Sequence, residues 1–319
     1  MKIIIISDLH GHESWKDIVS KEENNSDLWI FMGDYFDSKT IPAQQQIENF
    51  KDIIDFKKEH LDKVILLWGN HSHHYLRGNK KQYTGYQGLH AIEIGELLNK
   101  ALSENLIQIC YKVENFLFSH AGVTKTWCEE NEIDINNIEQ SINDLFRYKP
   151  YCFEFNMGER FDKHGDDINQ SPIWVRPRSL SEDKIEGFIQ IVGHTAQESL
   201  ITTGDIILTD TLGTSGEYLE INNGILTAKK CNSKEEIKNE DDRIDFIKKK
   251  MRKEQIIAGI ERRIGDEQRK HPLLDWKKIA AYKIYATYFD DKNKELITAV
   301  EGDSCAVCGC TEFWNDEEE

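Results

Sequence analysis

The sequence has no long apolar segment and no excess of basic side chains. No apolar run among its 319 residues approaches the roughly 18 that a membrane-spanning helix needs, so we expect no membrane association. The apolar run at residues 3–6 is short and has no cleavage site after it, so we expect no signal peptide. With 40 basic and 57 acidic side chains the net charge is -17, which disfavours a broad nucleic-acid-binding surface. A phosphate substrate is still compatible, because bound cations can supply positive charge.

Apolar residues make up 39% and charged residues 30% of the chain, which is typical of a folded globular protein. Within its first two-thirds, a short apolar run ends in a polar side chain five times. The five runs are residues 3–7, 28–32, 64–68, 116–119 and 188–192. Their Ile and Val content predicts central strands, and helical spacing over residues 43–60 and 89–102 predicts helices between them. Residues 205–210, 216–221 and 225–229 predict three further strands that close the second half of the sheet.

Polar side chains that follow the five runs should gather at one edge of this α/β sheet, where such folds bind ligands. They are Asp8, His10, Asp34, Asn70, His120 and His194. One such residue alone is more often a turn residue or a satisfied side chain, but the repeated pattern favours a site. Carboxylate, amide and imidazole groups together suit mid-row divalent metals. Six ligands predict two metals that share a carboxylate, and therefore metal-assisted hydrolysis of a phosphate ester.

Five motifs resemble those of the calcineurin-like metallophosphoesterases, over about residues 1–225. They are Ser7-Asp8-Leu9-His10-Gly11, Gly33-Asp34-Tyr35-Phe36-Asp37, Gly69-Asn70-His71, Ser119-His120-Ala121-Gly122 and Gly193-His194-Thr195. The second motif and the His-Thr ending of the last are similar to the phosphoprotein phosphatase branch, which includes bacterial and phage members. The resemblance implies an α/β fold in which two mixed β-sheets pack together and are flanked by helices.

The resemblance also implies a role for each matched residue. Asp8 and His10 would hold the first metal, Asp34 would bridge, and Asn70, His120 and His194 would complete the second site. His71 would donate a proton to the leaving oxygen, and Asp37 would orient it. We expect two divalent ions, Mn in the first place, with Fe, Zn, Ni or Mg as alternatives.

Phosphate needs a further positive partner, and Arg176 in the segment Pro172-Ile173-Trp174-Val175-Arg176 resembles the arginine that the family supplies. Arg178 is the fallback, and an ordinary surface arginine is the structural alternative. Two departures from the branch stand out: Ser38-Lys39 follows Asp37 in place of an Arg-Gly pair, and Ser72 follows His71 in place of a glutamate. Together they remove one phosphate clamp, which Lys39 would replace only as a point charge.

The remaining chain is less informative. His73 and His74 follow a ligand loop, where we expect exposed polar side chains, and residues 123–187 are predicted to be irregular. We divide the chain into a catalytic domain, residues 1–230, and a charged helical extension, residues 231–319, with a second helix over residues 274–288. The extension would pack on its own chain or bind a partner. Its cysteines Cys305, Cys308 and Cys310 have half the spacing of a zinc ribbon, so reduced thiols are favoured over a structural zinc.

The sequence therefore predicts a binuclear metallophosphatase that hydrolyses phosphomonoesters by in-line attack of a metal-bridging hydroxide. A Ser/Thr phosphoprotein is the favoured substrate, and dinucleoside polyphosphate hydrolysis is the alternative, ahead of phosphodiesterase or nuclease activity. A metal-binding scaffold is the non-enzyme alternative, although all six ligands and the acid–base pair are present. Seven cysteines without a paired framework predict a reducing, cytoplasmic location, and the oligomeric state is left open.

Overall fold

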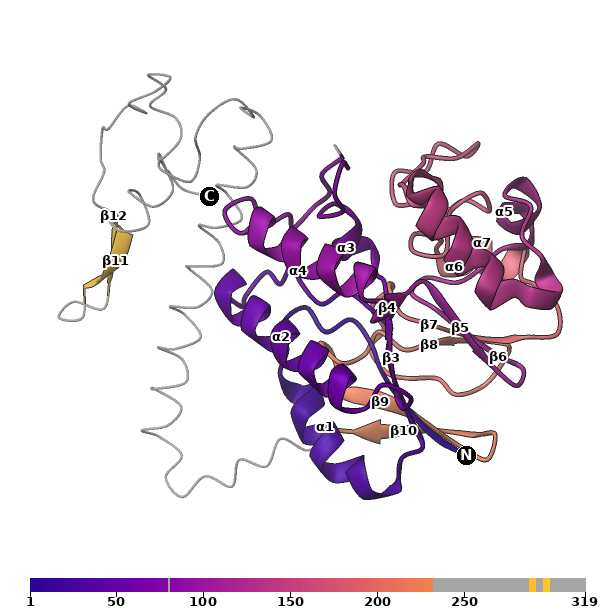
Figure 1. Cartoon of the computed structure of the whole chain (residues 1–319), viewed down its shortest axis with the longest axis horizontal. Helices are drawn as coiled ribbons and strands as arrows, with labels where there is room; N and C mark the ends of the chain where they lie inside the picture. Colours follow the sequence, from indigo (N-terminus) through magenta and orange to yellow (C-terminus); the bar gives the residue numbers. More distant parts are fainter. Residues whose placement is uncertain (80, 232–286, 291–294, 299–319) are drawn as a thin grey trace.

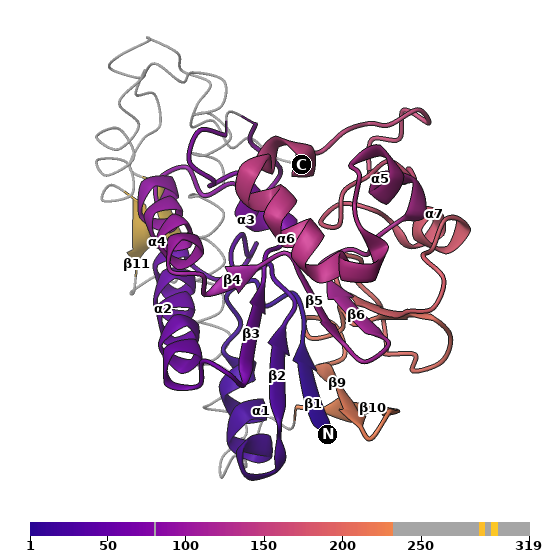
Figure 2. The ribbon, with the colours of Figure 1, turned by 45° about the vertical axis from the view of Figure 1, so that its right-hand side comes forward.

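The computed structural model describes residues 1–79, 81–231, 287–290 and 295–298. Two mixed β-sheets form its centre, and helices flank them on both sides (Figure 1 and Figure 2). The predicted fold class is therefore confirmed. In this described part of the chain, no helix combines the length and apolar character that crossing a membrane requires.

The first sheet has the strand order β10-β9-β1-β2-β3-β4. Its parallel strands are β1 (Lys2–Ile6), β2 (Leu28–Phe31), β3 (Val64–Leu67) and β4 (Ile107–Gln108). Its antiparallel strands are β9 (Glu217–Asn222), which pairs with β1, and β10 (Ile225–Lys230), which pairs with β9.

The second sheet has the order β5-β6-β7-β8. Its strands are β5 (Cys110–Val113), β6 (Phe116–Ser119), β7 (Ile189–Val192) and β8 (Ile206–Leu208), and the last three run parallel. The five predicted strands are thus β1, β2 and β3 of one sheet and β6 and β7 of the other. Of the three later strands, only β8 joins the second sheet. The prediction was wrong for β9 and β10, which extend the first sheet: β9 pairs with β1, and β10 pairs with β9.

Helices α1 (Ser14–Glu22), α2 (Ala43–Glu59) and α4 (Ala91–Ser103) lie beside the first sheet, as Figure 2 shows, and α2 and α4 confirm the predicted helical spacing. The region predicted to be irregular contains α5 (Lys125–Glu130), α6 (Ile138–Tyr148) and α7 (Pro177–Glu182), so that prediction was wrong. Ile138, Ile142 and Phe146 form the buried face of α6 at helical spacing. The short elements are α3 (Asn70–His73) and the 3-10 turns Glu23–Asn25, Ile135–Asn137 and Pro150–Phe153.

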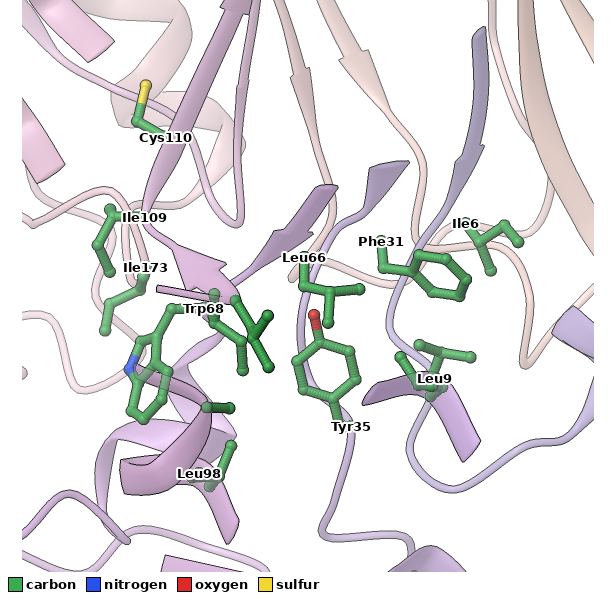
Figure 3. Close-up of a cluster of buried hydrophobic side chains, with 14 of the residues drawn as sticks. Ile6, Leu9, Phe31, Tyr35, Leu66, Trp68, Leu98, Ile109, Cys110 and Ile173 are labelled. Atoms are coloured by element: carbon green, nitrogen blue, oxygen red, sulfur yellow. The ribbon is translucent and has the colours of Figure 1, made fainter. Parts of the chain in front are cut away.

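Strand β1 explains why four isoleucines follow one another. Ile3 and Ile5 face the second sheet and pack in one cluster with Phe118 of β6, whereas Ile4 and Ile6 belong to the cluster beneath the helices. Figure 3 shows Ile6 in that second cluster with Leu66 and other side chains of the first sheet. Burying such a side chain contributes about 1.5–3 kcal/mol, so β1 is stabilised from both faces and holds the residues that follow it firmly.

Two strands of the extension are described, β11 (Thr287–Asp290) and β12 (Glu295–Thr298), and they pair antiparallel. The predicted helix over residues 274–288 was therefore wrong at Thr287 and Tyr288, where β-branched and aromatic residues favour a strand. The rest of the predicted helical extension lies outside the described residues, as do Cys305, Cys308 and Cys310. The domain division at residue 230 stays a prediction.

Candidate metal centre

The predicted ligands lie at the carboxyl ends of strands from both sheets. Asp8 and His10 follow β1, Asp34 follows β2, Asn70 follows β3, His120 follows β6 and His194 follows β7. The two sheets therefore bring together residues that are far apart in the sequence: His120 Nε2, after β6 of the second sheet, lies 3.2 Å from Asp34 Oδ2, after β2 of the first.

The backbone turns sharply where these strands end. Left-handed φ angles occur at five of the predicted site residues: Asp8 (46°), His10 (41°), Asp34 (51°), Asp37 (69°) and His194 (65°). Each such angle costs a non-glycine residue about 1–3 kcal/mol, and such strain tends to gather at functional sites. The fold therefore tolerates an unfavourable backbone in order to direct these side chains.

Two glycines permit close approach to the carboxylates. An added Cβ at Gly69 would lie 2.5 Å from the backbone N of Asp34 and would also collide with its carboxylate. An added Cβ at Gly193 would collide with the side chains of Ser7 and Asp8. Both positions therefore require glycine for space.

Two groups of side chains in the described residues have ligand atoms close enough to hold a metal ion. One group is His10, Asp34 and His71, and the other is Asp34, His120 and His194; within each, the ligand atoms lie within 4.8 Å of one another. Asp34 belongs to both groups, which is the arrangement expected of a bridging carboxylate.

Three of these histidines have one ring nitrogen beside a backbone carbonyl. His10 Nδ1 lies 2.6 Å from O of Phe36, His120 Nδ1 lies 2.8 Å from O of Met32, and His194 Nε2 lies 3.1 Å from O of Trp174. A carbonyl only accepts hydrogen bonds, so that nitrogen carries the proton and the other ring nitrogen of a neutral imidazole holds a lone pair. Metal-binding histidines are oriented in this way.

The second ring nitrogens of His120 and His194 face oxygens that only accept hydrogen bonds. The Oδ1 atom of Asn70 lies 2.8 Å from His120 Nε2 and 2.9 Å from His194 Nδ1, and Asp34 Oδ2 lies 3.2 Å from His120 Nε2. Such a convergence of acceptors is stabilised by a positive charge among them. This donor set of carboxylate, amide and imidazole therefore fits divalent metals.

The charges at the centre show the same preference for a cation. Burial opposes the protonated form of His120, but the negative charges of Asp34 and Asp8 raise its pKa to about 9. Burial, together with the positive charges of His120 and Arg176, holds the pKa of His194 well below its ordinary value. His194 is therefore neutral, which is the form that binds a metal.

Asp8 lies in neither of the two groups. Its carboxylate is buried, and both of its oxygens lie 3.1 Å from the backbone N–H of His194, which donates to them. The hydroxyl of Ser7 also donates to Asp8. Asp8 thus joins the end of β1 to the end of β7, and its charge acts on His120 from that position.

His71 and Asp37 are paired as predicted from the resemblance. Asp37 Oδ2 lies 2.9 Å from His71 Nδ1, and His71 also belongs to the group with His10 and Asp34. Burial disfavours a charged His71, but the charges of Asp34 and Asp37 raise its pKa above the ordinary value. This geometry can place a proton at the metal cluster, and it also allows His71 to act as a ligand.

Arg176 lies at the second group. Its Nη1 donates to O of His194 at 3.1 Å and to the Thr195 hydroxyl at 3.0 Å, and its Nε donates to O of His164 at 2.8 Å. Arg178 is instead paired with Glu182 at 3.1 Å on an exposed surface. The structure thus brings Arg176, and not the fallback Arg178, to the predicted site.

Sequence reasoning missed His73 and His74, which are buried rather than exposed, at 1% and 4%. His74 lies 2.7 Å from the carboxylate of Asp37. Its spacing of three residues from His71, just after a strand end, could have indicated a shared helical face. Asp210 was also missed: burial and the charges of Asp8 and Asp34 raise its pKa to about 8.

Two sheets with acidic and histidine ligands at their carboxyl ends are the features of a metal-dependent phosphoesterase. Residues 1–196 match the family model described as calcineurin-like phosphoesterase, and the chain belongs to that family. The family implies a binuclear divalent metal centre and a hydrolase that acts on phosphate esters.

Several solved structures match part of the chain. A cold-active protein tyrosine phosphatase is 19% identical with a TM-score of 0.48, covering 72% of this chain and 76% of its own. A protein serine/threonine phosphatase from Saccharomyces cerevisiae is 13% identical with a TM-score of 0.43, covering 74% and 82%. A metallophosphoesterase from Sphaerobacter thermophilus is 12% identical with a TM-score of 0.42, covering 81% and 98%. No curated protein matches the chain. At such low similarity, none of these likenesses bears on the substrate.

Proposed function

We propose that this phosphoesterase is a phosphomonoesterase of the phosphoprotein phosphatase type. The observation that carries the proposal is the pair His71–Asp37 beside the two ligand groups, with 2.9 Å between Nδ1 and Oδ2. A monoester has a poor leaving group when its oxygen departs without a proton, so a proton donor at the metal cluster suits it.

Each residue has a proposed role. Asp8 and His10 would hold one divalent ion, Asn70, His120 and His194 would hold the other, and Asp34 would contribute to both. Such ions, when bound, supply Lewis acidity at the phosphate and make a water nucleophilic at neutral pH. His71 donates a proton to the leaving oxygen while Asp37 fixes its tautomer. Arg176 binds the phosphate oxygens from the side of His194 and Thr195.

The preference for a phosphoprotein rests on the second motif and on the His-Thr ending, and Mn is the proposed metal. A dinucleoside polyphosphate is the second candidate, since Lys39 is exposed and the arginine clamp of the branch is missing. A cytoplasmic location stays a prediction; of the described cysteines, Cys110, Cys128, Cys152 and Cys231 are free thiols.

Four substrates distinguish these alternatives in the full-length protein loaded with Mn(II): a phosphopeptide, a dinucleoside tetraphosphate, an aryl phosphate and a bis-aryl phosphodiester. We expect turnover of the phosphopeptide and of the aryl phosphate, and none in protein treated with a chelator. Preferred turnover of the tetraphosphate would establish the second candidate. Turnover of the diester alone would rule out the monoesterase, and turnover of none with metals bound would favour a scaffold.

A further inference from the structure

The carboxylate of Asp37 is held by more than its partner His71. Asp37 is buried at 4%, and its Oδ2 lies 2.9 Å from His71 Nδ1 and 2.7 Å from His74 Nε2. Its Oδ1 accepts a hydrogen bond of 2.5 Å from the hydroxyl of Tyr75. Both oxygens are therefore engaged, and two of the three groups around them have no part in the metal cluster.

Backbone N–H groups of a neighbouring loop determine which atoms of these two additional groups carry a proton. The N–H of Tyr83 donates to His74 Nδ1 at 3.2 Å, so Nδ1 is an acceptor and the ring proton is on Nε2, the nitrogen that lies 2.7 Å from Asp37 Oδ2. The N–H of Gln87 donates to the Tyr75 hydroxyl at 2.7 Å, which leaves the hydroxyl proton for Asp37.

Aromatic packing restrains these groups further. The His74 ring stacks on Tyr83 with centroids 5.9 Å apart, and it meets the edges of Tyr75 and Tyr86 at 4.3 and 5.1 Å. His71, His74 and Tyr75 are spaced i, i+3 and i+4 along the turn that begins with α3, so they lie on one side of it. The Asp37 carboxylate therefore lies among side chains whose own orientations are restrained by packing.

We propose that His74 and Tyr75 are positioning residues that fix the Asp37 carboxylate, so that His71 presents its ring to the leaving oxygen in one orientation. The inference rests on the proposed phosphomonoesterase function. A carboxylate with only one partner could rotate away from His71, and the proton would then be delivered less efficiently.

Less efficient proton delivery is detected by comparing substrates whose leaving groups differ in basicity. In the Mn-loaded full-length protein, kcat and KM are measured for 4-nitrophenyl phosphate, whose leaving group needs little protonation, and for phenyl phosphate, whose phenol titrates near pKa 10, about that of tyrosine. His74→Leu removes the donor, and His74→Gln retains an N–H that can reach Asp37. His73→Leu is the matched control, since His73 is an adjacent histidine that is equally buried.

We expect His74→Leu to lower kcat for phenyl phosphate by about tenfold or more, a part of the roughly 10²–10⁴-fold that a general acid contributes. The loss with 4-nitrophenyl phosphate should be much smaller, KM and bound Mn should not change, and His74→Gln should restore most of the rate. Tyr75→Phe should show the same dependence on the leaving group, and it supplies the measurement if His74→Leu does not fold.

Equal losses with both esters, or values for His74→Leu equal to those for His73→Leu, would overturn the positioning role while the wild-type rates still support the monoesterase. A wild-type protein that binds Mn but turns over neither ester would instead overturn the proposed function and this inference with it. The two failures are therefore distinguishable by the wild-type rate alone.

Discussion

Replacing Gly69 by alanine adds a single methyl group where the structure has no room. The new Cβ would lie 2.5 Å from the backbone N of Asp34, whereas ordinary contact begins at 3.4 Å, so the atoms must separate by about 0.9 Å (3.4 minus 2.5). The φ angle of Gly69 is −104°, which alanine adopts freely, so the effect comes from the collision alone. Because Asp34 belongs to both ligand groups, its displacement should disturb both metals.

The expected loss can be stated as metal affinity. Disturbing the groups that position metal ligands typically costs about 10–100-fold in affinity, which is about 1.4–2.8 kcal/mol of binding free energy. Calorimetric titration of the metal-free protein with Mn(II) measures it. Gly213→Ala is the matched control, since an added Cβ there meets no atom within 4 Å. Equal Mn affinity in the two variants would refute the placement of Asp34 between the metals.

Three further predictions concern the neighbours of the centre and the stability of the fold. Asp37→Asn should lower kcat by about 10²-fold or more, because His71 loses the carboxylate that orients it, while bound Mn measured by atomic absorption stays as in the wild type; earlier loss of metal would mean that Asp37 is misassigned. Arg176→Lys should lower kcat/KM for an aryl phosphate by about tenfold, because a point charge replaces a bidentate donor, whereas Arg178→Lys on the exposed surface should not; similar effects of the two would remove Arg176 from the site. Glu22→Gln should lower the free energy of unfolding at pH 7 by about 1.5–3 kcal/mol, the range for a hydrogen bond to a charged group, because Glu22 Oε2 lies 2.7 Å from Lys2 Nζ and Oε1 accepts from Tyr218 at 2.8 Å. Burial would raise the pKa of Glu22, but Lys2 and Tyr218 hold it below the ordinary value, so this stability is present above pH of about 4.3 and is lost as the pH falls through the folded pKa. Urea unfolding should therefore show a wild-type advantage that shrinks towards pH 3, and the exposed Glu13→Gln should show little at either pH; a constant advantage would contradict this.

The strands and the residues that follow them could be predicted from the sequence, because short apolar runs that end in Asp, Asn or His are local patterns. The carbonyls of Met32, Phe36 and Trp174 that orient three histidines could not, since a backbone carbonyl carries no sequence signal and these contacts span distant segments.

Other features were missed although a local signal existed. Ile138, Ile142 and Phe146 have helical spacing inside the region predicted to be irregular. The acidic residues between them led to the prediction of an irregular segment instead of a helix. His74 was expected to be exposed because histidine usually is after a ligand loop, whereas in the structure Tyr83 and Tyr86, from a later segment, pack against it. The return of β9 to β1 is a long-range pairing that strand patterns do not specify.

The central claim is that Asp34 joins two metal sites built from the ends of both sheets. Electron paramagnetic resonance of the Mn-loaded protein reports this directly, because two Mn(II) ions that share a ligand are magnetically coupled. We predict a coupled pair in the wild type, a single uncoupled ion in Asn70→Ala, and no coupled pair in Asp34→Asn. A coupled pair that persists in Asp34→Asn, or only isolated Mn(II) in the wild type, would contradict the account.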